Sequence, residues 1–328
     1  MRQRTADLIE RMRAGDRVAL AKLMTLVENR APETVEVMSR LHREGRTVRS
    51  VGITGPPGAG KSTLVDRLVG ALRTRGERVG VLAVDPSSPF SGGAVLGDRI
   101  RMQSHFLDEG VFIRSLSARG RVGGLARAAG DMVGLLAAFG QQTVLVETVG
   151  VGQNEFDVMR LADTVVVVLV PEAGDTVQAM KAGLLEIADV FVVNKADRDG
   201  AARMRSELEA MLQLRTDHPW TVPVLATVAS EGRGIEALLE AIDAHGAYLA
   251  RSGDGAARAA AGRHEAFVSA LREELGRRVE IALRAGAFGD VLAAVRRGDI
   301  DPYTALVQVL SDPGLSAATQ PATDGPPR

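Results

Sequence analysis

The chain has 328 residues, with 40 basic and 41 acidic side chains and a formal net charge of -1. This balance creates no global field toward nucleic acid or an anionic membrane, so we expect neither as a partner. The sequence contains no cysteine, which excludes disulfides, thiolate nucleophiles and cysteine-based metal sites. Residues 1–17 lack the apolar core of a secretory signal, and the longest apolar run, residues 164–170, is too short to cross a bilayer. We therefore expect a cytoplasmic protein.

The spacing of apolar residues predicts helices near the start of the chain and then a series of strands. Apolar residues recur at helical spacing between residues 5 and 44, which predicts two or three amphipathic helices. Residues 48–54 (VRSVGIT) predict a strand, and residues 64–75 predict the helix that follows it. Further β-branched runs predict strands at residues 79–84, 143–147, 164–170 and 190–194, with a weaker one at 222–227. Helical stretches separate these runs, so we expect an α/β fold with a doubly wound, mostly parallel sheet.

A glycine-rich loop joins the first predicted strand to its helix. It reads GPPGAGKST and matches the phosphate-binding pattern G-x-x-x-x-G-K-[ST] in the strand–loop–helix setting that this motif requires. We expect Lys61 to reach the β- and γ-phosphates of a nucleotide, Ser62 to bind Mg²⁺ and Thr63 to contact the α-phosphate. The predicted nucleotide-binding residues of the loop are Gly55, Pro56, Pro57, Gly58, Ala59, Gly60, Lys61, Ser62 and Thr63.

The residues that end the strand at 190–194 are predicted to select the base. Asn194, Lys195 and Asp197 belong to the sequence NKAD, which is typical of guanine nucleotide proteins. The Asp197 carboxylate can accept hydrogen bonds from the ring N–H and the exocyclic amine of guanine, whereas adenine presents an acceptor and no amine there. We therefore expect GTP and GDP rather than ATP. A later loop is expected to support the base through main-chain N–H groups of Val228, Ala229 and Ser230.

Three carboxylates are expected close to the phosphates. Asp85 ends the second predicted strand and opens a Pro-, Ser- and Gly-rich segment, residues 85–102, whose composition is typical of a mobile switch and which also carries Asp98. Glu147 ends the next predicted strand, and Gly150 can offer its N–H to the γ-phosphate. Carboxylate oxygens are ligands of Mg²⁺ and can position the attacking water. The candidate metal ligands are Ser62, Asp85, Asp98 and Glu147.

The C-terminal part of the chain is predicted to be helical. Residues 256–284 show one long helical pattern, and Asp301-Pro302 is typical of a helix cap followed by its first turn. Residues 312–328 contain four prolines and no periodicity, which predicts a disordered tail. We therefore expect an N-terminal helical segment (1–47), a P-loop GTPase domain (48–250), a C-terminal helical arm (251–311) and the tail (312–328).

Together these motifs resemble the MeaB/ArgK family, the GTPase chaperones of methylmalonyl-CoA mutase. The resemblance rests on GPPGAGKST, DPSSPFSGGAVLGDRIRM, ETVGVGQNE, NKAD and the helix opened by Asp301-Pro302-Tyr303, and it covers nearly the whole chain except the tail. It implies a Mg²⁺-dependent GTPase that forms a homodimer through its C-terminal helices. It also implies a protein partner, an adenosylcobalamin-dependent mutase, whose cofactor loading the family gates and which it protects from inactivation.

The resemblance also assigns catalytic roles and a second switch. The switch corresponds to residues 171–183 (PEAGDTVQAMKAG) and is expected to respond to the mutase. The catalytic residues that the resemblance implies are Lys61, Asp85, Asp98, Glu147, Gln178 and Lys181.

Two other functions can use the same phosphate loop. A small-molecule kinase would transfer phosphate to an amino acid and prefer ATP, and the sequence NKAD argues against that preference. A metal-insertion GTPase would be related to proteins with His-rich or Cys-containing metal sites, whereas the five histidines here form no close ligand pattern. Both are alternatives to the chaperone function.

Overall fold

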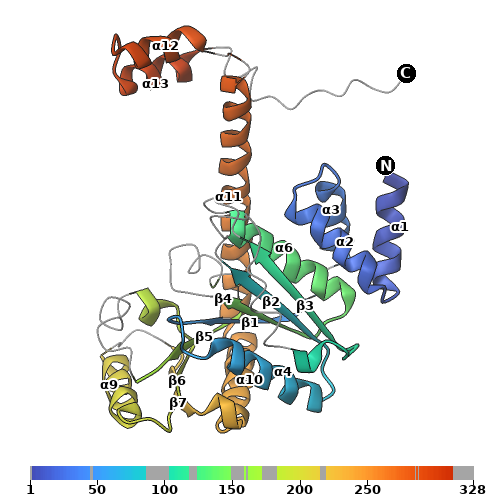
Figure 1. Cartoon of the computed structure of the whole chain (residues 1–328), viewed down its shortest axis with the longest axis vertical. Helices are drawn as coiled ribbons and strands as arrows, with labels where there is room; N and C mark the ends of the chain where they lie inside the picture. The colour runs from blue at the N-terminus through green and yellow to red at the C-terminus, as the bar shows by residue number, and fades with distance from the viewer. Residues whose placement is uncertain are drawn as a thin grey trace. The chain divides into compact units, whose positions relative to one another are not determined.

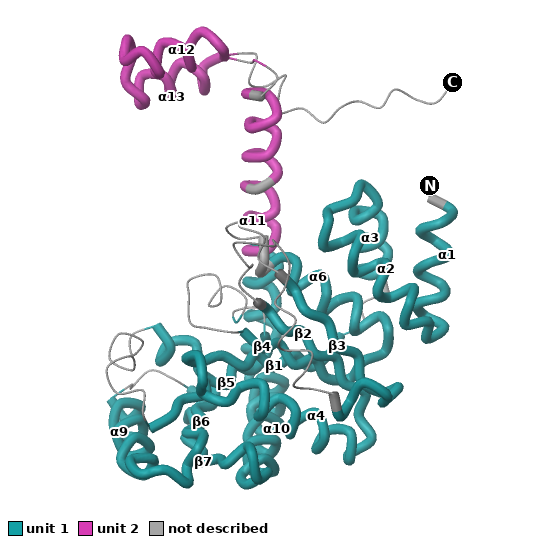
Figure 2. The backbone as a smooth tube through the Cα atoms, in the orientation of Figure 1, with its two compact units in different colours: residues 1–264 teal, residues 265–328 magenta. Residues whose placement is uncertain are grey.

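The computed structural model divides the chain into two compact units, residues 1–264 and residues 265–328, shown in teal and magenta in Figure 2. The division falls within one long helix, α11 (Asp254–Arg284). In the part of the chain that is described, no helix is both long and apolar enough to span a membrane. The structure describes residues 2–44, 47–85, 103–117, 124–148, 159, 162–171, 183–214, 219–284, 286 and 288–312.

A seven-stranded sheet forms the centre of the first unit. Its strands lie in the order β3-β2-β4-β1-β5-β6-β7, and every neighbouring pair is parallel (Figure 1). This arrangement confirms the predicted doubly wound sheet. The connections run in opposite directions on the two sides of β1, and ligands of such sheets bind at this point, at the carboxyl ends of the strands. The strands are β1 (Arg49–Thr54), β2 (Val79–Asp85), β3 (Val111–Ser117), β4 (Thr143–Thr148), β5 (Thr164–Leu169), β6 (Val190–Asn194) and β7 (Val224–Thr227).

Helices bury both faces of the sheet. On one face α6 (Gly124–Phe139) and α9 (Ala201–Gln213) pack on the sheet, and α6 is covered in turn by α1 (Arg2–Arg13), α2 (Arg17–Glu28) and α3 (Thr34–Glu44). The other packs against α4 (Lys61–Thr74) and α10 (Ile235–Ser252). The N-terminal helices α1, α2 and α3 confirm the predicted helical pattern, and their apolar side chains belong to the same buried cluster as the sheet.

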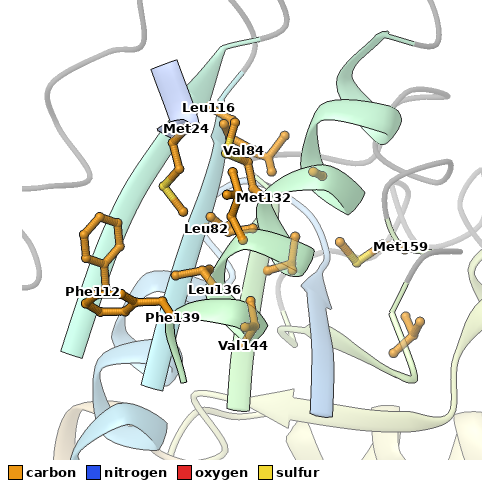
Figure 3. Close-up of a cluster of buried hydrophobic side chains, with 14 of the residues drawn as sticks. Met24, Leu82, Val84, Phe112, Leu116, Met132, Leu136, Phe139, Val144 and Met159 are labelled. Atoms are coloured by element: carbon orange, nitrogen blue, oxygen red, sulfur yellow. The ribbon is translucent and has the colours of Figure 1, made fainter. Parts of the chain in front are cut away.

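Alternate side chains of the central strands enter opposite clusters, which explains their continuous aliphatic sequences. In β5, Val165 and Val167 belong to the cluster beneath α6, whereas Val166 and Val168 belong to the cluster beneath α4. Both clusters exclude water, so neither face of the strand can carry polar residues. Figure 3 shows part of the first cluster, where side chains of α6 meet those of β2 and β3.

The edge strand β3 was not predicted, and its environment explains why. Its sequence, VFIRSLS, contains the partly buried Arg114. The guanidinium of Arg114 lies 2.7 Å from a carboxylate oxygen of Glu28 in α2, which compensates the buried charge. The guanidinium of Arg17, also in α2, donates to the carbonyl oxygen of Val111 at 2.7 Å. Helix α2 thus covers part of this strand through polar contacts. Arg114 and the two serines interrupt the apolar residues of β3, so this strand lacks the continuous aliphatic pattern of the central strands.

An ionic network fastens the first turns of α11 to the amino ends of β5 and β6. Asp189, which is buried just before β6, accepts hydrogen bonds of 3.0–3.2 Å from Arg258 of α11 and lies 3.3 Å from Nε2 of His245. The fully buried His245 is hydrogen-bonded through Nδ1 to Oγ1 of Thr164 at 2.9 Å. Trp220 packs on the His245 ring and donates its Nε1–H to the Asp189 carbonyl at 2.8 Å. We call these five residues the amino-edge network.

The second unit contains the end of α11 followed by α12 (Gly289–Arg297) and α13 (Pro302–Ser311). Asp301 caps α13 as predicted, because its carboxylate accepts hydrogen bonds from the main-chain N–H groups of Tyr303 and Thr304 at 2.9 and 3.1 Å. Helix α12 was not predicted. The predicted tail lies outside the described residues beyond Asp312. Large exposed apolar side chains of this unit are Phe267, Leu271, Leu275, Ile281, Tyr303, Leu306, Val307 and Leu310.

Candidate nucleotide site

The loop between β1 and α4 lies against the ends of neighbouring strands. Gly55 and Gly60 have φ angles of +144° and +86°, which side chains other than glycine rarely adopt. A Cβ atom at Gly55 would overlap the carbonyl oxygen of Val168, and one at Gly60 would lie 2.5 Å from Nδ2 of Asn194. The two glycines therefore allow a close approach of main chains. The loop leads directly into the N-terminus of α4, where main-chain N–H groups and the helix dipole favour an anion.

Lys61 places a positive charge at this loop. It is the first residue of α4 and is only 5% exposed. Its ammonium group donates hydrogen bonds to the carbonyl oxygens of Gly55 at 2.8 Å and Pro56 at 3.0 Å. The charge is thus held beside the main chain that is expected to surround the phosphates.

Ser62 and Glu147 meet at the carboxyl ends of β1 and β4. The Ser62 hydroxyl donates to Oε1 of Glu147 at 2.6 Å, and both side chains are buried. Nearby, the Thr148 hydroxyl donates to that of Thr54 at 3.0 Å and joins the same two strand ends. A hydroxyl and a carboxylate are hard oxygen donors, so this pair fits Mg²⁺. Asp85 ends β2, the neighbour of β4, and therefore lies at the same edge of the sheet.

Asn194 connects the phosphate loop to the predicted base-reading residues. This buried side chain donates from Nδ2 to the carbonyl oxygen of Ala59 at 2.8 Å. Its Oδ1 accepts hydrogen bonds from the Thr227 hydroxyl at 3.0 Å and from the N–H of Ala229 at 3.1 Å. One amide therefore joins the loop after β1, the end of β6 and the segment after β7. The sequence predicted Asn194 but gave no indication of Thr227.

The turn after β6 presents Asp197 to solvent. Lys195 adopts a left-handed φ of +55°, which is unusual for a residue with a side chain. The next residue, Ala196, donates its N–H to the Thr227 carbonyl at 3.0 Å, so the turn is attached to the end of β7. Asp197 follows and is exposed. A strained turn fixed in this way can hold a carboxylate in position for a base.

The segment after β7 forms a short 3₁₀ helix, η2 (Ala229–Glu231), preceded by the buried Val228. The N–H of Ala229 is bonded to Asn194, so it contributes to the site by fixing the segment. The Arg67 guanidinium, from α4, donates to the carbonyl oxygens of Ala229 at 3.1 Å and Ser230 at 2.8 Å. The sequence did not single out Arg67, because its position beside η2 depends on the packing of α4 against a segment more than 150 residues away.

The remaining predicted site residues either are exposed or lie partly or wholly outside the described residues. For Asp85 the structure describes only the main chain at the end of β2. Among the loop residues, Pro57, Gly58 and Thr63 are exposed. Outside the described residues lie Asp98, Gly150, Gln178 and Lys181.

Comparisons with known proteins show the family to which the chain belongs. A family model described as methylmalonyl Co-A mutase-associated GTPase MeaB matches residues 20–283. A Pyrococcus abyssi protein named as a GTPase is 47% identical over 310 residues, which are 93% of this chain and 96% of that protein. GTPase ArgK of Escherichia coli is 37% identical over 319 residues, 93% of this chain and 95% of that protein. A crystal structure of an LAO/AO transport system kinase superposes with a TM-score of 0.67 at 32% identity, covering 93% of this chain and 96% of that one.

The family match spans the phosphate loop, the strand ends and the base-reading turn, and the relatives align over nearly their whole length. These matches confirm the guanine nucleotide chemistry that the NKAD turn indicates. The chain therefore belongs to the methylmalonyl-CoA mutase-associated GTPase family, MeaB, and is a P-loop GTPase.

Proposed function

We propose that this GTPase is a chaperone of an adenosylcobalamin-dependent methylmalonyl-CoA mutase, acting in cofactor loading and in protection from inactivation. The supporting observation is the Asn194 junction, which joins the phosphate loop to the base-reading turn in a chain of the MeaB family. Such a junction suits a switch, because a nucleotide contacts several loops at once. GTP and GDP would then favour different conformations, and the mutase would bind one of them more tightly.

Separate groups of residues are proposed to bind the phosphates, the guanine base and Mg²⁺. The loop from Gly55 to Thr63 and the N–H of Gly150 bind the phosphates, with Lys61 at the transferred group. Asn194, Lys195 and Asp197 recognise guanine, with η2 behind them. We assign Mg²⁺ to Ser62, Asp85, Asp98 and Glu147, which would hold it where it would neutralise negative charge on the phosphates. The residues proposed to act in hydrolysis are Lys61, Asp85, Asp98, Glu147, Gln178 and Lys181.

The donor set can be tested separately from the fold. Ser62→Ala removes one oxygen donor and leaves the Glu147 carboxylate in place. We expect the Mg²⁺ concentration for half-maximal GTP turnover to rise at least about tenfold, because one donor to a hard cation is lost. Thr74→Ala, on the exposed end of the same helix, is the control. Equal Mg²⁺ dependence in wild type and Ser62→Ala would contradict the assignment.

The apolar side chains of the second unit support a proposed homodimer. Tyr303 is 82% exposed and Val307 63% exposed, and α13 also exposes Leu306 and Leu310. Extended apolar surface of this kind marks association sites. We propose that residues 251–311 form the dimerisation arm, alongside the helical segment 1–47, the GTPase domain 48–250 and the tail 312–328. We also propose a cytoplasmic location.

Light scattering tests the arm. The wild type should have twice the mass of one chain, whereas Leu306→Glu combined with Leu310→Glu should give a monomer, because two charges would be buried at the interface. A wild-type monomer at micromolar concentration would contradict the dimer.

The chaperone function is tested by adding the purified mutase. The expected result is faster GTP hydrolysis in the presence of the mutase, since Val151 occupies the place where Ras-like GTPases have a water-positioning glutamine and intrinsic turnover should be slow. Adenosylcobalamin transfer to the mutase should depend on GTP and fail with Lys61→Ala. Unchanged hydrolysis and unchanged cofactor transfer would contradict the proposal. Appearance of labelled γ-phosphate on an amino acid, rather than as free phosphate, would instead favour the kinase.

A further inference from the structure

Arg67 makes contacts that none of the predicted nucleotide-binding residues makes. It lies on the second turn of α4, and its Nε and Nη2 atoms donate to the successive carbonyl oxygens of Ala229 and Ser230. The guanidinium is a planar fork, so two simultaneous hydrogen bonds fix both direction and distance. A single side chain thereby attaches η2 to the helix that carries the phosphate-binding residues Lys61 and Ser62.

These two hydrogen bonds also determine where main-chain N–H groups point. The carbonyl of Ala229 and the N–H of Ser230 belong to one planar trans peptide, in which they point in opposite directions. Holding the carbonyl toward α4 therefore turns the Ser230 N–H away from α4. The preceding peptide is fixed independently, because the Ala229 N–H is bonded to Asn194. Arg67 and Asn194 thus orient consecutive peptides of η2 from two sides.

We propose that Arg67 is a positioning residue for guanine binding, and this inference rests on the proposed roles at the base-reading site. It acts through η2 and need not touch the nucleotide. Since Arg67 shares one helix with Lys61, proposed to bind phosphate, and Ser62, proposed to bind Mg²⁺, the base-supporting segment and the phosphate loop keep a fixed separation. The expected ligand is a purine nucleotide that contacts both the phosphate loop and η2. Arg67 should affect only the part of the binding affinity that comes from the base.

The test compares a complete nucleotide with a phosphate-only probe. Arg67→Met keeps the aliphatic stem and removes both donors, and Arg67→Lys keeps the charge without the fork. Displacement of a fluorescent GDP analogue by GDP and by inorganic tripolyphosphate gives both affinities. We expect GDP to bind about tenfold more weakly to Arg67→Met, as two partly exposed hydrogen bonds are lost. Tripolyphosphate should bind within about twofold of wild type, and Arg67→Lys should give an intermediate GDP affinity.

Arg75→Met is the matched control. Arg75 follows the same helix, and its guanidinium is ion-paired with Asp243 and Glu236 of α10 rather than with η2. Its loss can lower the melting temperature of the nucleotide-free protein but should leave the GDP affinity unchanged. A purely structural role for Arg67 would lower melting temperature and both affinities together, as any loosening of α4 would.

Two outcomes overturn the inference while leaving the proposed nucleotide function intact. They are a GDP affinity of Arg67→Met within twofold of wild type, and equal losses for GDP and tripolyphosphate. Failure of the wild-type protein to bind GDP more tightly than ADP would overturn the base-reading site and, with it, the role of Arg67. A GDP-specific loss that Arg75→Met does not share supports the inference.

Discussion

The parallel strands all begin along one edge of the sheet, the amino edge, and all end along the opposite one, the carboxyl edge. Polar side chains are buried along both, but their partners differ. At the amino edge, carboxylates meet guanidiniums: Asp189 bonds to Arg258, and Glu77 lies 2.9 Å from Arg49. At the carboxyl edge, the Ser62 hydroxyl meets Glu147 and the Lys61 ammonium meets main-chain carbonyls. Where a buried charge is paired with one of opposite sign from the same chain, loss of either partner leaves the other uncompensated and destabilises the fold. Charged groups held by hydroxyls and carbonyls are positioned for a ligand that carries charge of its own.

The difference teaches that burial of polar groups alone does not identify a functional site. Asp189 and Glu147 are nearly equally buried, at 2% and 3% exposure. Their surroundings separate them, since Asp189 is bonded to elements that pack against the sheet and Glu147 to the phosphate helix. Substitutions should therefore reduce stability at the amino edge and turnover at the carboxyl edge.

The largest expected effect is at the carboxyl edge. Lys61→Ala should lower GTP turnover by at least about 10³-fold, because a charge at the transferred phosphate is lost. The melting temperature should change little, since the hydrogen bonds to the Gly55 and Pro56 carbonyls are lost together with the desolvation cost of the buried ammonium group. Phosphate release and thermal unfolding measure the two quantities. Lys22→Ala, on the exposed face of α2, is the control, and turnover of Lys61→Ala within tenfold of wild type would break the comparison.

Substitution in the amino-edge network should lower stability and leave GTP turnover nearly unchanged. Asp189→Ala removes the acceptor of Arg258 and of the Val165 N–H, so the free energy of unfolding should fall by about 3 kcal/mol. Turnover per folded molecule should stay within about twofold of wild type. Denaturant unfolding and GTP hydrolysis measured on the same preparation check both. A folded Asp189→Ala protein with lost turnover would mean that the two edges do not divide stability from chemistry as stated.

The smallest expected effect concerns Asp131, a residue of α6 that belongs to neither edge of the sheet. Asp131 of α6 is partly buried, and desolvation raises its pKa from 3.8 to about 6 against the attraction of Arg127 and Arg30. A raised carboxyl pKa means that the folded state binds its proton more tightly. Stability is then lost as pH rises from about 4 to about 6, by on the order of 2 kcal/mol. Asp131→Asn should remove this part of the pH dependence of the melting temperature, and superimposable profiles for the two proteins would contradict it.

Most strands of the sheet, the phosphate loop and the base-reading turn could be predicted from the sequence. The central strands were predicted because they are buried on both faces and therefore aliphatic, and the phosphate loop and the NKAD turn because their chemistry requires fixed spacing. Strand β3 was missed because Arg114 and two serines interrupt its apolar residues. Helix α12 was missed because it has only nine residues and follows Phe288, whose left-handed conformation no pattern indicates.

The contacts that assemble the site could not be predicted in the same way. Arg67 reaches Ala229, and Asn194 reaches Ala59, across separations of 162 and 135 residues. Such contacts depend on the order of the strands in the sheet, which local periodicity does not determine. Asn194 was visible in the sequence through its motif, whereas Arg67 and Thr227, which hold the same segments, were not.

Calorimetric titration of the nucleotide-free protein with GTP, GDP and ATP tests the central claim most directly, with Asp197→Ala as the matched variant. The account predicts stoichiometric binding of GTP and GDP, at least about 100-fold weaker binding of ATP, and loss of that preference in Asp197→Ala. Binding of ATP as tight as that of GTP, or no binding of either guanine nucleotide, would contradict it.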